Sequence, residues 1–138
     1  MSKKNIKMNL DLAQKLIAAA KMKAEEIGVA MVISVVDEGG NLVATQRMDN
    51  GLLVSINLSI NKAYTCVAVK IPTHVLGSVS QSGQPLFGIH SADNGRIVIF
   101  GGGLPLIHND AIIGAIGVSG GSVEQDIQCA TAGADSLK

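Results

Sequence analysis

The sequence predicts one α+β domain, in which helices pack against an antiparallel sheet, and three observations predict it. Helical and strand-like patterns follow one another as helix, two strands, helices, two or more strands and helix. Short turns join the strands of each pair, which favours antiparallel pairing. Apolar residues make up 47% of the 138 residues, and a chain of this length buries enough surface for one packed core.

The first elements are predicted to be a helix and a β-hairpin. Apolar residues recur at three- and four-residue steps over residues 9–27, with Asn9 as the N-cap and Gly28 as the stop. The β-branched apolar run at 30–37 predicts a buried strand. The turn sequence EGGN separates it from a second strand at 42–48, so the two strands form a hairpin.

Helical spacing returns from about Leu52 to Val69, and Pro72 ends this second helix. Lys62 is a polar residue of this helix, and we expect it to lie outside the helix's buried apolar face. Thr73 is positioned to cap a short helix that runs through Ser80. The apolar stripe of the second helix is expected to consist of Leu53, Ile56, Ile60, Ala63 and Val67.

The stretch 80–95 is the longest irregular segment and is expected to be a functional or interface loop, with Leu86, Phe87 and Ile89 to bury. A strand interrupted by three glycines is predicted at 96–109 and another at 111–120, joined by a turn at Asn109-Asp110. Ser122 opens the last helix, which runs to about Leu137.

The glycine-rich stretch GAIGVSGGSVEQ admits a phosphate-binding and an architectural interpretation. Ser122 and Gln125 form a capping-box pattern that satisfies the free N–H groups of the helix, and two acidic residues in its first turn repel phosphate. We therefore expect no nucleotide. Gly114 and Gly117 are expected to admit a closely packed backbone, and the glycine pair at 120–121 to form the turn. This corner and the GGGLP corner are expected to border a shallow pocket.

Composition excludes several classes of function. Eleven basic and eleven acidic side chains cancel, and only three residues are aromatic, so neither nucleic acid nor a membrane is an expected partner. The N-terminal lysines precede no apolar run, which predicts no signal peptide or membrane span and a cytoplasmic location. Cys66 and Cys129 are expected to be buried thiols.

The chain resembles the GlcG/HbpS family, which also includes the C-terminal domain of PduO-type proteins. The resemblance extends from about Leu10 to the C-terminus, through VVDEGGNLVATQRMD, NKAYT, QPLFGI, GGGLP and IIGAIGVSGGSVEQDIQCATAG. It implies a profilin-like fold, a homo-oligomer, haem binding in several members, and occurrence with glycolate, propanediol and glycerol utilisation systems. Residues 1–138 are then one domain of this family, with residues 1–8 loosely ordered.

Two positions depart from the pattern of the family. Asp110 stands where a glycine is usual in the turn before the final strand, and Asp tolerates the left-handed conformation better than most residues. The first helix contains no His, Cys or Tyr, and Met22 is its one side chain of a kind that could serve as an axial ligand of haem iron. An axial haem ligand is therefore expected mainly from elsewhere.

Haem binding requires an apolar slot, an axial donor and cations for the propionates. His90 is the preferred axial ligand because it follows Phe87 and Ile89, and His74 is the second choice. His108 precedes a hairpin turn and is expected to be an exposed turn residue. The cations available for carboxylates are Arg47, Lys62 and Arg96.

A second group of residues offers an alternative function. Arg47 and Lys62 are expected to share one rim with Asp49 and Asp126, either as a structural pair or as the site of a small hydroxy-carboxylate or polyol. Gly102, Gly103, Ser119 and Gly120 are expected to wall this ligand site.

No sequence pattern indicates a catalytic set or a closed zinc site, so an enzyme is less expected than a haem-binding accessory protein. An enzyme or accessory factor for such a small ligand remains the alternative. A structural partner of a dehydratase-type complex is the other alternative.

Overall fold

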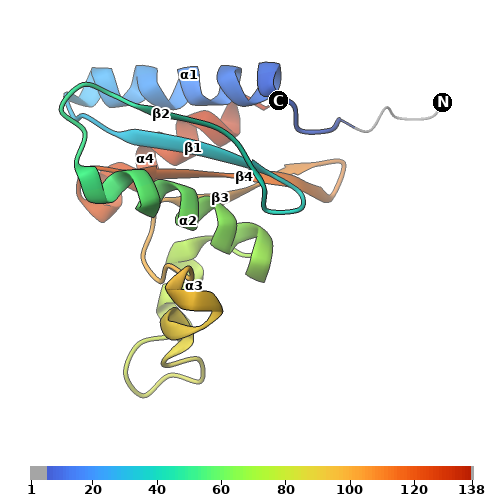
Figure 1. Cartoon of the computed structure of the whole chain (residues 1–138), viewed down its shortest axis with the longest axis vertical. Helices are drawn as coiled ribbons and strands as arrows, with labels where there is room; N and C mark the ends of the chain where they lie inside the picture. The colour runs from blue at the N-terminus through green and yellow to red at the C-terminus, as the bar shows by residue number, and fades with distance from the viewer. Residues whose placement is uncertain (1–5, 138) are drawn as a thin grey trace.

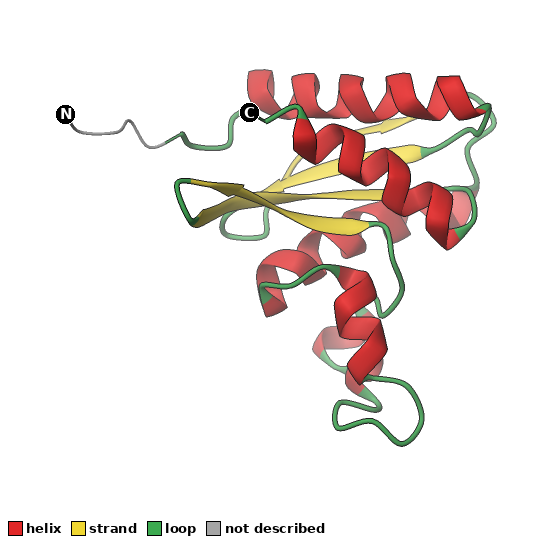
Figure 2. Ribbon diagram, turned by 180° about the vertical axis from the view of Figure 1, so that it is seen from behind, coloured by secondary structure: helices red, strands yellow, loops and turns green. Residues whose placement is uncertain are grey.

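The computed structural model describes residues 6–137, which form a four-stranded antiparallel sheet with helices on both faces (Figures 1 and 2). The strand order is β2-β1-β4-β3. The strands are β1 (Val32–Asp37), β2 (Leu42–Arg47), β3 (Gly103–His108) and β4 (Ala111–Ser119). The helices are α1 (Leu10–Ile27), α2 (Leu53–Val69), α3 (Thr73–Val79) and α4 (Val123–Asp135), with short 3₁₀ turns at Ile89–Ser91 and Asp93–Gly95. The predicted α+β class with an antiparallel sheet is confirmed.

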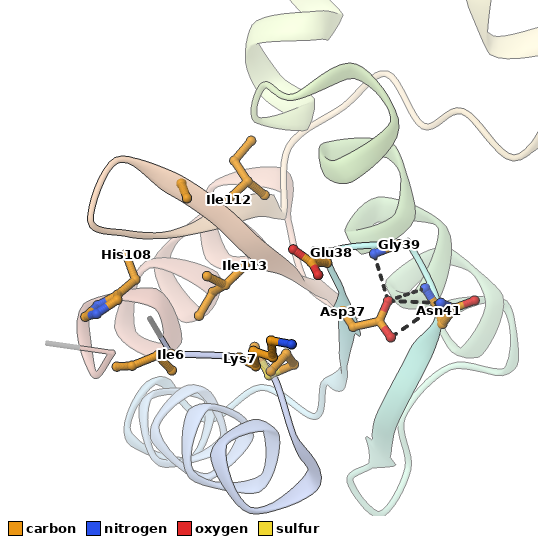
Figure 3. Close-up of a pocket in the computed structure, with 11 residues that line it drawn as sticks. Ile6, Lys7, Asp37, Glu38, Gly39, Asn41, His108, Ile112 and Ile113 are labelled. Carbon is orange, nitrogen blue, oxygen red and sulfur yellow. Dashed lines mark hydrogen bonds between the residues drawn. The ribbon is translucent and has the colours of Figure 1, made fainter. Parts of the chain in front are cut away.

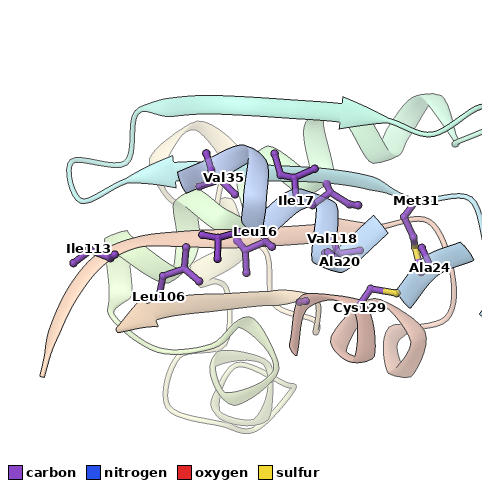
Figure 4. Packing of buried hydrophobic residues seen from close by; sticks show 14 residues of the cluster. Leu16, Ile17, Ala20, Ala24, Met31, Val35, Leu106, Ile113, Val118 and Cys129 are labelled. Carbon is purple, nitrogen blue, oxygen red and sulfur yellow. The ribbon is translucent and has the colours of Figure 1, made fainter. Parts of the chain in front are cut away.

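The main core lies between the sheet and the α1–α4 layer (Figure 4). α1 begins where the Asn9 side chain accepts a hydrogen bond from the Leu12 amide at 2.8 Å, and it ends at Gly28, whose φ is 73°. Both predicted ends of this helix are confirmed. Its apolar face packs on alternate residues of the two central strands, and the shared cluster includes Leu16, Ile17, Ala20, Ile33, Val35, Ile116 and Val118.

The face that α2 turns to the sheet differs from the prediction. Leu53 is 84% exposed, whereas Lys62 is fully buried, so the expected apolar stripe is wrong at its start and the expected place of Lys62 is wrong. The hydroxyls of Ser59 and Ser34 lie 2.7 Å apart across the helix–sheet contact. The buried face of the helix thus carries mostly polar or small side chains. They are Ser55, Ser59, Lys62, Ala63, Thr65 and Cys66.

Thr73 does not cap α3. The N-cap is Pro72, which provides no side-chain hydrogen bond, and the Thr73 hydroxyl instead accepts a hydrogen bond from the Gly103 amide at 2.9 Å. The helix therefore starts beside the first residue of β3. This bond ties the short helix to the glycine-rich corner of the sheet.

The segment between α3 and β3 projects away from the sheet (Figure 1). Residues 96–102 form no strand, so the predicted strand at 96–109 is confirmed only from Gly103 to His108. Ile97 and Val98 are nevertheless buried. Leu86 and Phe87 are 43% and 64% exposed within the chain, so the expected functional or interface loop leaves both side chains on its surface.

The turn between β3 and β4 is built as predicted. Asn109 and Asp110 have φ values of 50° and 63°, so Asp110 takes the left-handed conformation that a glycine usually supplies. The predicted loose order of residues 1–8 lies largely outside the described residues, and the Met8 side chain packs against the main core. No helix in the described range 6–137 is long and apolar enough to span a bilayer.

Candidate functional site

A buried ion pair between α2 and α4 lies at the glycine-rich end of the sheet. Lys62 Nζ donates hydrogen bonds to Asp126 Oδ2 at 2.9 Å and to the Val118 carbonyl at 2.8 Å. The Phe100 ring covers the ammonium group, with its centroid 5.1 Å from Nζ. Lys62 is 0% exposed and Asp126 4% exposed, so this buried pair connects α2, α4 and β4 inside the protein.

Burial dominates the titration of both partners. It lowers the pKa of Lys62 because the ammonium form loses hydration, and the hydrogen bond to Asp126 offsets this only in part. Burial likewise raises the pKa of Asp126 despite its contact with Lys62. Since each residue is costly to bury alone, the two charges depend on one another.

The glycines around this pair occupy positions that have no room for a side chain. A Cβ on Gly102 would lie 2.6 Å from Lys62 Nζ, and one on Gly103 would lie 2.6 Å from the Lys62 carbonyl. A Cβ on Gly117 would lie 2.7 Å from the Ala63 amide nitrogen. The predicted close backbone approach at Gly117 is therefore confirmed. The space expected to be a shallow pocket between the two glycine corners is instead filled by the Lys62 side chain.

The amides of the glycine-rich turn already have side-chain partners. Asp126 Oδ1 accepts from the Gly121 amide at 2.9 Å. The predicted capping box is present: Ser122 Oγ accepts from the Gln125 amide at 3.1 Å, and Gln125 Oε1 accepts from the Ser122 amide at 3.0 Å. These are the donors that a phosphate at this helix N-terminus would use.

The structure brings together six of the eight predicted ligand-binding residues, but as an internal cluster. Ser119 Oγ lies 3.0 Å from Ser55 Oγ and is 4% exposed, which places it beside the buried ion pair. The other five members are Lys62, Gly102, Gly103, Gly120 and Asp126. Their role toward a ligand remains a prediction.

Arg47 and Asp49, the remaining two predicted ligand-binding residues, lie elsewhere. They line a pocket of about 340 Å³ together with Lys21 and Glu25 of α1. Arg47 donates to the Gly51 carbonyl at 3.3 Å and contacts neither partner of the buried pair. The expectation that Arg47 and Lys62 share one rim is therefore wrong, because the Lys62 ammonium group points into the protein.

The three histidines have different surroundings. His90 is exposed on the projecting segment, and its ring meets the exposed Phe87 ring edge to face, with centroids 6.5 Å apart. His74 is exposed at the start of α3. His108 is half-buried, where we expected an exposed residue. It lines a pocket of about 460 Å³ at the opposite end of the sheet, shared with Ile6, Lys7 and Glu38 (Figure 3).

A cluster of polar side chains holds residues 93–96 of the projecting segment against α2. The Tyr64 hydroxyl donates to the Asp93 carboxylate, and the Arg96 guanidinium lies over the Tyr64 ring at 3.6 Å from its centroid. Arg96 Nε donates to Asn61 Oδ1 at 3.1 Å. Sequence reasoning named Arg96 only as one of three cations, and the NKAYT motif was the one signal that pointed to its partners.

The cysteines and acidic residues offer no metal centre in the described part of the chain, where no group of three or more His, Cys, Asp or Glu side chains is positioned to hold an ion. Cys66 and Cys129 are both buried, as predicted. Burial raises the pKa of the Cys66 thiol to about 12 and that of Cys129 to about 11, so both are protonated at neutral pH.

Two bacterial proteins are similar to this chain in sequence. The chain is 49% identical over 119 residues to an uncharacterised 15.0 kDa protein of the dhaT-dhaS intergenic region of Citrobacter freundii, covering 86% of this chain and 84% of that protein. It is 48% identical over 115 residues to the corrinoid adenosyltransferase PduO of Citrobacter freundii, covering 83% of this chain but 34% of PduO.

The structure also superposes on a solved haem complex. The crystal structure of the PduOC:heme complex matches with a TM-score of 0.91 and 40% identity, covering 95% of each chain. The family model described as haem degrading protein HbpS-like matches residues 8–135. Because this match spans nearly the whole chain, the protein belongs to the HbpS-like family.

Proposed function

We propose that this chain is a haem-binding protein. The observation that carries the proposal is the exposed pair formed by His90 and Phe87 on the projecting segment, an imidazole beside an apolar ring. The haem complex of a 40% identical relative with the same fold supports it. When bound, haem supplies an iron centre whose reactivity depends on its axial ligand and on the polarity around it.

The residues present fit this group. His90 makes no hydrogen bond within residues 6–137, so an imidazole nitrogen is free to coordinate iron. Leu86 and Phe87 provide exposed apolar surface that a porphyrin face would cover. His74 is the second exposed imidazole, whereas His108 lies at the far end of the sheet beside the β1–β2 turn.

Titration with hemin tests the proposal. The wild-type chain is expected to give a saturable shift of the Soret band, because imidazole ligation changes the electronic environment of the iron. His90→Ala is expected to abolish or displace this shift, whereas His108→Ala, the matched control, is expected to retain it. If the wild-type protein gives no saturable spectral change, the proposed function is wrong.

The proposed setting is that of an accessory protein in a glycolate, diol or glycerol-type catabolic system, in the cytoplasm. The names of the relatives support this setting, since one is encoded between dhaT and dhaS and another is PduO. A dehydratase-type enzyme is the proposed protein partner. The net charge of zero gives the chain no electrostatic preference for nucleic acid or an anionic membrane.

The chain is further proposed to be a homo-oligomer. Its mean hydropathy is +0.36, and several large apolar side chains are exposed, which a contact between copies of the chain would bury. Light scattering at micromolar concentration is expected to give a mass that is a multiple of 14.2 kDa, and a monomeric mass would contradict it. The exposed apolar residues include Leu52, Leu53, Val54, Val75, Leu86, Phe87, Phe100 and Val123.

A further inference from the structure

Arg96 is a half-buried cation without an anionic partner in the described range. The ion pairs among residues 6–137 are Lys23–Glu26 and Lys62–Asp126, and neither involves Arg96. Its Nε is bonded to Asn61, but no hydrogen bond within the same residues uses its two terminal amino groups. A half-buried guanidinium in this state carries two amino groups whose N–H donors are suited to a carboxylate.

The position of this guanidinium is fixed before any ligand arrives. The Tyr64 ring lies beneath it, and the hydroxyl of the same ring is bonded to Asp93, on the N-terminal side of Arg96 in the chain. On the C-terminal side, the Val98 amide donates to Thr65 Oγ1 at 3.0 Å. Because stacking and these bonds hold the Arg96 guanidinium in place, the Arg96 side chain has little conformational entropy left to lose on binding.

We propose that Arg96 binds a propionate carboxylate of the haem whose iron is coordinated by His90. This inference rests on the proposed function. Guanidinium binds carboxylate with two parallel hydrogen bonds, and haem carries two carboxylates at one edge. Both residues belong to the segment that projects between α3 and β3, so they lie on the same part of the fold.

The other two candidate cations are less suitable. Lys62 is fully buried, and Asp126 already binds its ammonium group. Arg47 lies at the end of β2, where it lines a pocket with Lys21 and Glu25 of α1. Of the three, Arg96 is the one that combines available donors with a place on the segment that carries His90.

A comparison of two porphyrins tests this assignment. Hemin and hemin dimethyl ester have the same iron and ring, but the ester lacks the carboxylate charges. Arg96→Gln is expected to weaken hemin binding on the order of 10-fold, the scale of a charge-assisted hydrogen bond. The same variant is expected to bind the dimethyl ester as the wild-type chain does. Both affinities are measured from the Soret change in one buffer.

Two variants control for the fold and for general charge. Arg47→Gln removes a cation outside the projecting segment and is expected to leave both affinities unchanged. Tyr64→Phe keeps the ring beneath the guanidinium and is expected to retain the preference for hemin over its ester. Circular dichroism and thermal unfolding of each variant establish that it is folded before titration.

The outcomes separate the two proposals. Selective loss of hemin affinity in Arg96→Gln supports the assignment. Unchanged hemin affinity overturns it, and so does an equal loss for both porphyrins, because Arg96 then acts only through the shape of the loop. If the wild-type chain binds neither porphyrin, the haem proposal itself is overturned.

Discussion

Asp126→Asn is expected to lower the free energy of unfolding by about 3–5 kcal/mol, the usual cost of removing one partner of a buried ion pair. The amide keeps the shape of the side chain and an oxygen for the Gly121 amide. It leaves the Lys62 ammonium fully buried without its counter-charge. Urea unfolding at pH 7 and a fixed protein concentration measures the change.

The double variant Lys62→Met/Asp126→Asn distinguishes a lost charge partner from general disruption. It removes both charges and keeps similar volumes, so part of the lost stability is expected to return, although the Val118 carbonyl loses its lysine donor. Glu124→Gln alters an exposed carboxylate in the same helical turn and is expected to change stability by less than about 0.5 kcal/mol. If Asp126→Asn is as stable as the wild-type chain, Lys62 does not depend on Asp126 as a charge partner.

The pH dependence of Asp126→Asn has a definite sign. Burial lowers the folded-state pKa of Lys62, so the unfolded chain binds more protons between that lowered value and the ordinary value of 10.5. Stability in this window therefore rises with pH and is lost as the pH falls through the folded-state pKa. Asp126→Asn removes the hydrogen bond and the charge that raise the Lys62 pKa, so that pKa falls further in the variant and this recovery of stability is larger there. The deficit of the variant relative to the wild-type chain is therefore expected to be smaller at pH 10 than at pH 7.

Gly117→Ala is expected to cost more than about 3 kcal/mol or to prevent folding, at the upper end of what overpacking costs. A methyl group there would be pressed against the Ser59 carbonyl, well inside van der Waals contact, and would lie 2.7 Å from the Ala63 amide nitrogen. Both obstacles are helix backbone, which cannot rotate away as a side chain can. The helix would have to leave the sheet, and the Lys62 head group would move with it.

Gly83→Ala is the matched control for this substitution. Gly83 has a φ of 85°, and nothing lies within 4 Å of a Cβ built on it, so only the cost of the left-handed conformation applies. That cost is about 1–2 kcal/mol. Thermal and urea unfolding of the two variants are compared directly. Equal losses at the two sites would show that close packing at Gly117 is not what the glycine provides.

Local chemistry was sufficient to predict the ends of the elements. Asn9 and Gly28 bound α1, Ser122 opens α4 through its capping box, and Asp110 supplies the left-handed turn residue. Each of these signals acts within a few residues of the chain. For that reason they can be read without knowing which segments meet in the fold.

The orientation of α2 was not predictable in the same way. Its spacing favours burial of Leu53, yet Lys62 is the residue that is buried. The reason is tertiary: glycines in β4 and in the corner before β3 let the helix approach closely, and Asp126 compensates the lysine charge. A sequence pattern within one helix does not record a partner that lies on another helix.

The candidate haem site combines one residue named from the sequence with one that the structure singles out. His90 follows from the apolar residues near it in the sequence, but the preference for Arg96 depends on Tyr64 and Asn61 of α2, which are distant in the chain. The sequence did not tell whether Phe87 is buried within the chain or exposed for an interface, and the structure leaves its ring exposed.

The absorption spectrum of the full chain, purified from haem-replete cells, tests the central claim most directly. The account predicts a Soret band in the wild-type protein that is lost or displaced in His90→Ala and retained in His108→Ala. A colourless wild-type protein that also fails to take up added hemin would contradict it.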